Sequence, residues 1–571
     1  MRITAIEIEN FKGISERVRV ELKPITLLFG ANSAGKSTIL HALMYMKDVL
    51  DRRNLDAITT PVSGPALDLG GFRRFVHGHD LSRTVRIALS LDLTGKELPR
   101  MARFYDLGTF SGDKKTDQFL DSHDQAWSDI LCWIKSAKVE IEVRWDKKSC
   151  KPVASAYTVG LNGSDFIRIE WDGERRKATT MNWLNPAVSR PMTENERRLC
   201  WFDYDLEEGR ELTPQEKEDA TPYARVSALQ TVKPLFAGKK STLSGLLNWL
   251  PRSQDPISDF SYREDLTLPE AIDWSEFDFK GRDYRFYQEL AAWQAWEGTE
   301  FLARLAFGPG KLLRERLQGL RYIGPLRARL DRQGIPSDEL SDWSEGLAAW
   351  KALESEENSS DLIKQVSQWL ADKDRLNSGY ELERKHRAQV DVTAFRQIVE
   401  GDLDRARLLE LLKEAPKSAE IKLVDKRSRL ELDPSDVGVG ISQVLPIVVG
   451  AVVPGASVVA IEQPELHIHP AMQVALGDLF IEGATKRGMS FLIETHSEHL
   501  MLRLLRRIRE TTEGELPPGG VELRPEDVSV VYVQSGANGV EMVPLLIDET
   551  GEFSTKWPRG FFDERAEELF G

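Results

Sequence analysis

The stretch that decides the fold reads ITLLFGANSAGKSTILHALMY and spans Ile25–Tyr45. Its beginning, Ile25–Phe29, is almost entirely apolar and predicts a buried strand. Gly30–Ser37 then match the pattern GxxxxGK followed by Ser or Thr, and the apolar residues that come next recur at helical spacing. A glycine-rich turn between a strand and a helix is the context in which this pattern binds phosphate. We therefore expect a nucleotide-binding P-loop in an α/β domain.

The residues of this turn have distinct expected roles toward ATP and Mg²⁺. Backbone N–H groups would close around the phosphates, Lys36 would reach the β- and γ-phosphates, and the Ser37 hydroxyl would bind Mg²⁺. Thr38 is expected to serve the helix more than the ligand. The candidate set is Gly30, Ala31, Asn32, Ser33, Ala34, Gly35, Lys36, Ser37 and Thr38.

The second half of such a site is an acid that ends a buried strand, called the Walker B acid. Val458–Glu462 supplies this pattern, and Glu462 would hold Mg²⁺ through its water shell. This acid lies more than 400 residues after the P-loop, which is too far for a compact P-loop domain. We therefore expect a head whose two lobes are separated by an inserted module.

Two further segments resemble parts of ABC-type ATPase heads. The next apolar strand ends in Thr495 and His496, where such heads carry a switch histidine that senses the γ-phosphate. The segment DVGVGISQVLP, residues 436–446, predicts a glycine-rich turn that opens an apolar helix. Such heads have their signature motif here, which grips the γ-phosphate of ATP on a second subunit through a helix N-terminus. The alternative is a simple helix cap; the candidate residues are Gly438, Gly440, Ser442 and Gln443.

Eight strings, in order, bracket nearly the whole chain and resemble one family. They are IENFKGI, FGANSAGKST, LDLGGFRRFVHGHD, YIGPLR, DVGVGISQVLP, IEQPELHIHP, FLIETHSEHL and WPRGFFDE. The chain is similar to the RecF/SMC-like and OLD-like AAA/ABC-type ATPases, and specifically to bacterial members with a C-terminal DUF3696 region. The resemblance implies ATP, Mg²⁺, a homodimer or higher oligomer with composite ATP sites, and a phosphate contact from Lys12, for which a solvated turn lysine is the alternative. Relatives in anti-phage defence restrain an effector, often a nuclease, so an effector protein is an expected partner.

The chain departs from the wider ABC pattern next to the Walker B acid. Gln463 stands where these heads have the catalytic glutamate. An amide cannot accept the proton of the attacking water, so general-base help of about 10²–10⁴ in rate would be missing. Glu465 is the nearest replacement, and the alternative for it is a helix-N-terminal acid stabilised by the dipole. We therefore expect an ATPase that is slow or that only holds ATP, with Gln463, Glu465 and His496 as the candidate catalytic residues.

Two other departures concern binding. The segment that resembles the Q-loop has no glutamine, and His77, His79 and Asp80 are its polar substitutes. In the signature segment, Gly438 stands near the position where many relatives have serine, so Ser442 would serve instead or the contact is lost.

The expected fold class is α/β: a split ABC-type ATPase head, with two lobes and a mixed sheet around the P-loop, carrying a large and mostly helical insertion. The expected N-terminal lobe with the P-loop is 1–175, and the insertion, rich in tryptophan and charge, is 176–415. The C-terminal lobe, 416–571, would hold the signature, the Walker B acid, the switch histidine and the DUF3696-like tail. Three widely spaced cysteines without a CxxC pair support neither a disulfide framework nor a zinc site. With no apolar run of about 20 residues and no signal-peptide pattern, we expect a cytoplasmic protein without membrane contact.

Charge leaves nucleic acid binding open. A net charge of −15 argues against a surface that attracts DNA as a whole. The stretch Arg304–Arg332 is locally basic, and it could bind nucleic acid or an acidic partner. Arg327 within it could reach a phosphate or a partner, or form a structural ion pair. A second cluster, Arg503, Arg506, Arg507 and Arg509, is expected to be solvated or paired with acids rather than to contact DNA.

Four function classes follow. The first is an ATP-dependent regulator or scaffold of an effector, and the alternative is a RecF-like DNA-repair or DNA-clamping ATPase. A nuclease within the chain is disfavoured because the residues after His496 lack the clustered carboxylates of a two-metal site. A transporter subunit is disfavoured because the large insertion has no counterpart in those heads.

Overall fold

The computed structural model describes most of both lobes and part of the range between them. The described residues are 1–52, 54–57, 68–99, 131, 133–171, 176–181, 204–205, 210–211, 304–328, 343–355, 360–388, 396, 417–536 and 539–555. The string WPRGFFDE, Arg329, Arg332, Cys132 and Cys200 lie outside them.

A mostly parallel sheet forms the centre of the described chain. Its strand order is β11-β15-β16-β3-β17-β18, and only the last pair is antiparallel. The strands are β3 (Ile25–Gly30), β11 (Leu320–Ile323), β15 (Val458–Glu462), β16 (Ser490–Glu494), β17 (Val528–Gly536) and β18 (Gly539–Leu545). Because the carboxyl ends of parallel strands meet at one edge, the P-loop, the Walker B acid and the switch histidine are brought to the same edge.

Successive residues of β3 serve two different cores. Leu28 packs with the helix α1 (Lys36–Arg52) on one face of the sheet. Leu27 and Phe29 point to the other face. That face is covered by α13 (Val439–Val452), α14 (Pro470–Arg487) and α15 (Glu498–Glu513). Both faces are thus buried, which is why the strands read as continuous apolar runs.

A second sheet, antiparallel throughout, packs on the α1 side. Its order is β2-β1-β4-β5-β6-β7-β8. The strands are β1 (Arg2–Glu9), β2 (Val18–Glu21), β4 (Thr84–Asp92), β5 (Ser136–Asp146), β6 (Lys151–Leu161), β7 (Ser164–Trp171) and β8 (Arg176–Met181). The short helices α2 (Phe72–Phe75) and η1 (His77–His79) precede β4. One helix, residues 304–318, contributes Leu305, Leu313 and Leu317 to the same core.

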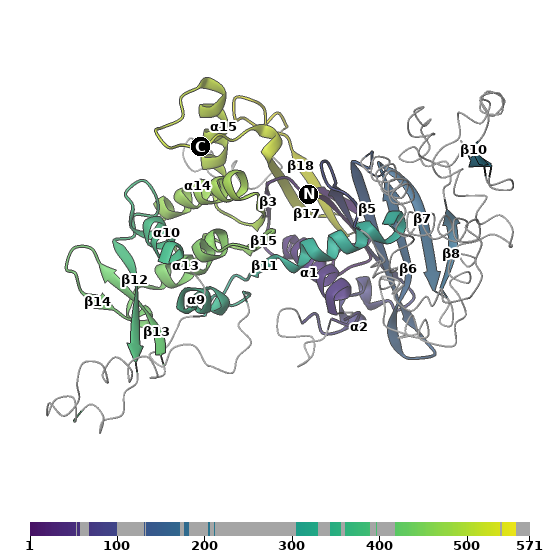
Figure 1. The fold of residues 1–571 in the computed structure, drawn as a ribbon, viewed down its shortest axis with the longest axis horizontal. Helices are drawn as coiled ribbons and strands as arrows, with labels where there is room; N and C mark the ends of the chain where they lie inside the picture. Colours follow the sequence, from purple (N-terminus) through teal and green to yellow (C-terminus); the bar gives the residue numbers. More distant parts are fainter. Residues whose placement is uncertain are drawn as a thin grey trace.

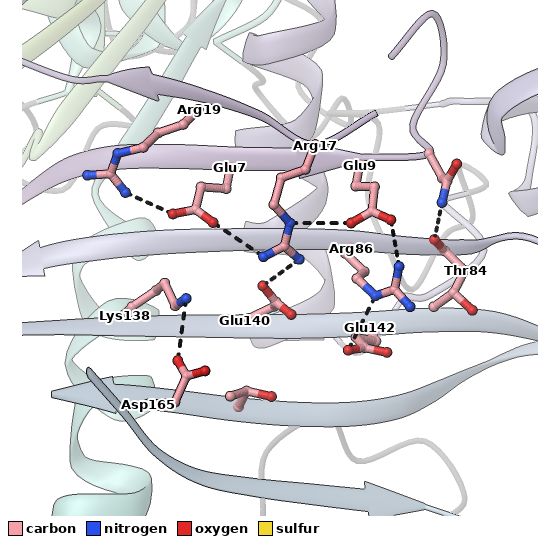
Figure 2. Close-up of polar contacts among 12 residues, drawn as sticks. Glu7, Glu9, Arg17, Arg19, Thr84, Arg86, Lys138, Glu140, Glu142 and Asp165 are labelled. Atoms are coloured by element: carbon pink, nitrogen blue, oxygen red, sulfur yellow. Dashed lines mark hydrogen bonds and ion pairs between the residues drawn. The ribbon is translucent and has the colours of Figure 1, made fainter. Parts of the chain in front are cut away.

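The opposite face of this sheet carries a network of ion pairs (Figure 2). Arg17 reaches Glu7, Glu9 and Glu140, the last at 2.8 Å. Arg86 on β4 extends the network, because it pairs with both Glu9 on β1 and Glu142 on β5. Cross-strand pairs of opposite charge favour one register over its neighbours. The face therefore stabilises the sheet and presents no large area of a single charge.

The remaining described elements lie around the C-terminal lobe. A small sheet of order β12-β13-β14 packs with α9 (Leu347–Glu354) and α10 (Ser360–Ala371) against α13. Its strands are β12 (Tyr380–Ala388), β13 (Lys417–Asp425) and β14 (Glu431–Leu432), and the short elements are β9 (Tyr204–Asp205), β10 (Arg210–Glu211), η5 (Pro434–Asp436) and η6 (Pro525–Asp527). Figure 1 shows β12–β14 and β5–β8 at opposite ends of the molecule.

The mixed α/β class is confirmed. The range 176–415, expected as a mostly helical insertion, contains β11, which is an edge strand of the central sheet. Its described residues also include β8, β9, β10 and β12 beside the helices, while most of 182–303 lies outside the described chain. Within the part that the structure describes, no helix is long and apolar enough to span a bilayer.

Candidate nucleotide-binding site

The P-loop has a backbone that requires glycine at two positions. A Cβ on Gly30 would lie 2.1 Å from the carbonyl oxygen of Val533, and the φ of Gly30 is 146°. Gly35 has a φ of 101°, and Ser33 adopts the left-handed region at 62°. The turn from Ala31 to Ser33 is exposed. Its N–H groups are therefore accessible to an anion at the start of α1.

Lys36 lies inside this loop and is only 3% exposed. Its ammonium donates hydrogen bonds to the carbonyl oxygens of Gly30 and Ala31, at 3.0 and 2.9 Å. Burial lowers the pKa of Lys36, and the carboxylates of Glu494, Glu465 and Glu462 oppose that shift. The nearest of these acids is Glu494, with an oxygen 3.9 Å from the ammonium. Lys36 is the cation of the loop, and phosphates would bind to it in competition with these acids.

Ser37 has a partner that the sequence reasoning did not identify. Its hydroxyl donates to a carboxylate oxygen of Glu494 at 2.6 Å. Glu494 ends β16 and lies directly opposite Glu462 in the strand register. The sequence did contain a pattern that could have identified Glu494. An acid ends the buried strand SFLIE, just as Glu462 ends the buried strand VVAIE.

The Walker B acid is held by groups from two other elements. The Tyr322 hydroxyl donates to Glu462 at 2.8 Å, and Nε2 of His41 lies 3.5 Å from the same oxygen. Burial raises the pKa of Glu462, and the neighbouring Glu494 carboxylate raises it further. The two strand-end acids therefore repel each other, and a cation bound near both would relieve that repulsion.

Lys12 contacts this acid indirectly. Its ammonium lies 2.6 Å from Nδ1 of His41. Burial, and then the Lys12 charge, lower the pKa of His41 to about 3, so the imidazole is neutral. A neutral imidazole that accepts at Nδ1 carries its proton at Nε2, which faces Glu462. Lys12 is therefore neither a solvated turn lysine nor, in this conformation, in contact with the P-loop.

Glu465 is bound to the switch segment. One carboxylate oxygen accepts from the Thr495 hydroxyl at 2.6 Å, and the other accepts from the backbone N–H of His496 at 2.8 Å. The helix α14 begins only at Pro470, so the alternative of a helix-N-terminal acid is wrong. Glu465 anchors the segment that presents the histidine.

The switch histidine has one ring nitrogen without a partner. Nε2 of His496 is buried and makes no hydrogen bond among the described residues. Burial lowers the pKa of His496, and the nearby Lys36 lowers it further. A neutral imidazole with an unsatisfied nitrogen beside the P-loop lysine fits a site that a phosphate completes.

Gln463 follows the Walker B acid in a strained turn. Its φ is 44°, in the left-handed region, and its N–H donates to the carbonyl oxygen of Glu494 at 2.8 Å. The backbone of Gln463 is therefore hydrogen-bonded to the end of β16. This bond fixes the position of its Cα beside Glu462 and Glu494 at the edge of the sheet.

The signature segment is only partly exposed to solvent. Gly438 is the N-cap of α13, and Val439 after it is 44% exposed. A Cβ on Gly440 would lie 2.9 Å from the His467 carbonyl oxygen. Ser442 and Gln443 are buried, and the Ser442 hydroxyl has no partner in the described chain. The structure therefore exposes the turn at Gly438 but neither polar side chain.

The polar residues in place of the Q-loop glutamine bond locally. Nδ1 of His77 donates to the carbonyl oxygen of Lys12 at 2.9 Å, which fixes the turn that carries Lys12. His79 contacts the backbone of Arg73, and Asp80 caps the turn to Ser82. These contacts do not reach the P-loop.

Four arginines in the described part of the basic stretch Arg304–Arg332 bind backbone carbonyls, whereas Arg314 is more exposed and pairs with Asp51. Arg321 donates to the carbonyls of Gly450 and Val453 at the end of α13. Other arginines of the stretch bind in the same manner to Leu98, Ser457 and Glu462, through Arg304, Arg316 and Arg327 respectively. Backbone carbonyls thus take up the charge of these four arginines. Among the described residues, Arg327 forms a hydrogen bond to the Walker B strand in place of an ion pair.

The second arginine cluster is paired with acids, as expected. Arg503 and Arg507 both contact Asp478 on α14. Arg506 and Arg507 contact Glu510 at 2.6 Å. The preference for an acid-paired face is therefore confirmed for these three arginines.

Family models match three parts of the chain. An AAA ATPase domain matches residues 1–149, and an AAA domain described as a putative AbiEii toxin of a type IV toxin–antitoxin system matches 336–502. The chain is an AAA-type ATPase. A protein family of unknown function, DUF3696, matches 523–570 of this ATPase, in agreement with the resemblance deduced from its strings. No curated protein matches it.

Solved SMC heads align with this ATPase over nearly its whole length, but their structural similarity to it is low. The head from Pyrococcus furiosus, bound to the C-terminal domain of ScpA, is 11% identical, with coverage of 95% and 96% of the two chains and a TM-score of 0.35. The head from Thermotoga maritima is 9% identical, with coverage of 96% and 100% and a TM-score of 0.33. The fold therefore rests on the strand order described above.

The described residues fit Mg²⁺ as P-loop ATPases bind it. They contain no group of three or more His, Cys, Asp or Glu side chains that could hold a metal alone. Mg²⁺ beside a nucleotide usually needs only one or two protein oxygens, because phosphates and waters complete its octahedron. Ser37 and Glu462, the pair expected from the sequence, would supply such oxygens.

Proposed function

We propose that this ATPase binds ATP with Mg²⁺ at its P-loop and uses the bound nucleotide to close a head-to-tail dimer that regulates an effector. The observation that carries the proposal is the meeting of Lys36, Ser37, Glu462 and the unpartnered nitrogen of His496 at one edge of the central sheet. Each group matches a part of a triphosphate or its metal.

The chain's own residues would divide the work. The loop N–H groups and Lys36 would bind the β- and γ-phosphates, releasing the lysine from the carbonyls of Gly30 and Ala31. Ser37 and Glu462 would hold Mg²⁺, which neutralises phosphate charge when bound. His496, neutral through its lowered pKa, would offer its free nitrogen to the γ-phosphate.

Slow hydrolysis is part of the proposal. Gln463 cannot accept a proton from water. Glu465 has both carboxylate oxygens engaged by Thr495 and His496, which leaves it better suited to hold the switch than to activate water. Retention of ATP would then be the signal, and hydrolysis the slow reset.

Dimerisation through the signature turn is supported by exposed apolar residues next to it. Two apolar side chains are exposed in the single chain, those of Val439 and Leu326. Val439 is the first residue of α13, and Leu326 precedes Arg327, which is hydrogen-bonded to Gln443 of the same helix. A Cβ on Gly438 would meet nothing within 4 Å, so the space beside this residue at the start of α13 is open. A partner's γ-phosphate would meet these groups at the helix N-terminus.

An effector, expected to be a nuclease in anti-phage defence, is the proposed partner of the dimer. The family description that names a toxin of a toxin–antitoxin system supports pairing with a second protein. The test is to measure mass in solution and co-purification of the neighbouring gene product, for the wild type and for Lys36→Ala, with and without ATP and Mg²⁺. A wild type that stays monomeric with ATP and binds no protein would end this proposal.

The RecF-like alternative has less support, because four arginines of the basic stretch bind backbone carbonyls and Arg314 pairs with Asp51. Its test is DNA binding at low and high salt with ATP present. Measurable affinity that falls steeply with salt would favour it over the effector proposal.

A further inference from the structure

We infer that Glu494 is a second metal-facing acid of the nucleotide site, which positions the Ser37 hydroxyl for Mg²⁺. The inference rests on the proposed binding of ATP with Mg²⁺ and adds a residue to it. In the proposed function, Glu462 is the one acid near Mg²⁺. The inference adds Glu494, which ends β16, as a second acid there.

Among the described residues, the Glu494 side chain has its hydrogen bond and its ion pair with the P-loop. One carboxylate oxygen accepts from the Ser37 hydroxyl at 2.6 Å, and the other lies 3.9 Å from the Lys36 ammonium. The residue is only 6% exposed, and the Ser37 hydroxyl and the Lys36 charge both favour its charged form, as does the charge of Lys12. A single buried carboxylate thus faces both P-loop side chains that take part in binding.

Strand order explains why this acid, and not Glu462, reaches Ser37. β16 lies between β15 and β3, so Glu494 is on the strand next to the P-loop strand, while Glu462 is one strand further away. Glu462 is turned to other donors, Tyr322 and His41. The two acids therefore approach the expected metal position from neighbouring strands with different partners.

The hydrogen bond gives Glu494 a chemical role when the metal binds. A serine that binds Mg²⁺ through its oxygen still has an O–H proton, which needs an acceptor. Glu494 supplies that acceptor, which orients the oxygen lone pairs and raises their basicity, as outer-shell carboxylates do for metal ligands. Its negative charge also adds to the attraction for the cation.

A purely structural role makes a different prediction. If Glu494 only holds the empty P-loop, its removal would change nucleotide affinity equally with and without Mg²⁺. If it positions Ser37, its removal would weaken the Mg²⁺-dependent part alone. The two roles therefore separate in a titration of Mg²⁺ rather than in a rate of hydrolysis.

The experiment titrates Mg²⁺ against binding of a fluorescent, non-hydrolysable ATP analogue. For Glu494→Ala we expect the Mg²⁺ concentration at half-effect to rise about 10- to 100-fold, with the Mg²⁺-free affinity changed by less than about threefold. Glu494→Gln, which keeps an acceptor for Ser37 but loses the charge, should lie between. Glu140→Gln, a matched control at the same 6% exposure in the antiparallel sheet, should leave the titration unchanged.

A double variant tests the route through serine. In the background of Ser37→Ala, the further change Glu494→Ala should have less effect on the Mg²⁺ half-point than it has in the wild type. A wild type that binds no analogue overturns the proposed function itself. A wild type with a clear Mg²⁺ dependence that both Glu494 variants retain overturns only the role of Glu494.

Discussion

The side-chain amide of Gln443 pairs with both backbone groups of Arg327. It accepts from the N–H at 3.3 Å and donates to the carbonyl at 2.8 Å. The Arg327 guanidinium, only 4% exposed, then donates to the carbonyl oxygen of Glu462 at 2.7 Å. The helix that opens with the signature turn and the strand that carries the Walker B acid are thus connected through one arginine.

Removal of that arginine side chain should destabilise the fold. Arg327→Ala leaves the buried Glu462 carbonyl without this donor, and we expect a loss of about 1–3 kcal/mol in the free energy of unfolding, measured by urea denaturation. Arg314→Ala is the matched control, because Arg314 is more exposed and its ion pair within the described residues is with Asp51, so its loss should stay below about 1 kcal/mol. Equal effects of the two substitutions would contradict the bridging role of Arg327.

Nucleotide affinity should depend on Lys36. We expect Lys36→Ala to weaken binding of an ATP analogue by about 10- to 100-fold, because hydrogen bonds to a charged group are lost. Isothermal titration calorimetry measures the change. Lys47→Ala, on the same helix, removes a lysine that bonds to the Leu320 carbonyl and should leave the affinity unchanged. Binding that survives Lys36→Ala at full strength would show that phosphates bind elsewhere.

Hydrolysis should be slow and limited by the residue after the Walker B acid. Gln463→Glu introduces a carboxylate at the position of the usual base, and we expect turnover to rise at least about tenfold, toward the 10²–10⁴ range of general-base catalysis. Phosphate release at saturating ATP measures it. The comparison variant is Glu465→Gln. A brisk wild-type rate that this variant abolishes would make Glu465 the base instead.

The pH dependence of stability should show how much the ion pairs of Asp478 with Arg503 and Arg507 contribute. Burial raises the pKa of Asp478, but hydrogen bonds from Arg507 and Arg503 outweigh it, so the net pKa lies below the ordinary value of 3.8. A depressed carboxyl pKa stabilises the fold above the unfolded-state value, and this contribution is lost as the pH falls through the folded-state value. Asp478→Asn should therefore lower the free energy of unfolding by about 2 kcal/mol at pH 7.

The deficit of Asp478→Asn should be the same at pH 5 and should shrink once the pH falls below the ordinary value of 3.8. Urea denaturation of both proteins along this series measures it. The control is Glu498→Gln. Glu498 is the first residue of α15, the helix that carries Arg503 and Arg507, but it is not one of the residues paired with Asp478. A deficit that grows as the pH falls would mean that the arginines do not hold Asp478 in its charged form.

The sequence alone was sufficient for features that lie within one short segment. The strand, turn and helix around Gly30–Ser37, the acid that closes VVAIE, and the histidine after SFLIET are local patterns with local physical causes. The α/β class follows from the same patterns. The pairing of Arg503 and Arg507 with acids was also foreseeable, because a surface helix with many charges is usually compensated.

Tertiary structure decided which distant groups meet. Ser37 and Glu494 are 457 positions apart and come together only because β16 is placed between β15 and β3. Gln443 was expected to face a partner's phosphate, yet packing of α13 turns it toward Arg327. The basic stretch was expected to bind nucleic acid or an acidic partner because of its charge, yet four of its arginines bind backbone carbonyls, which no sequence pattern marks. Local periodicity determines the elements, whereas the order of strands in the sheet determines which side chains share a site.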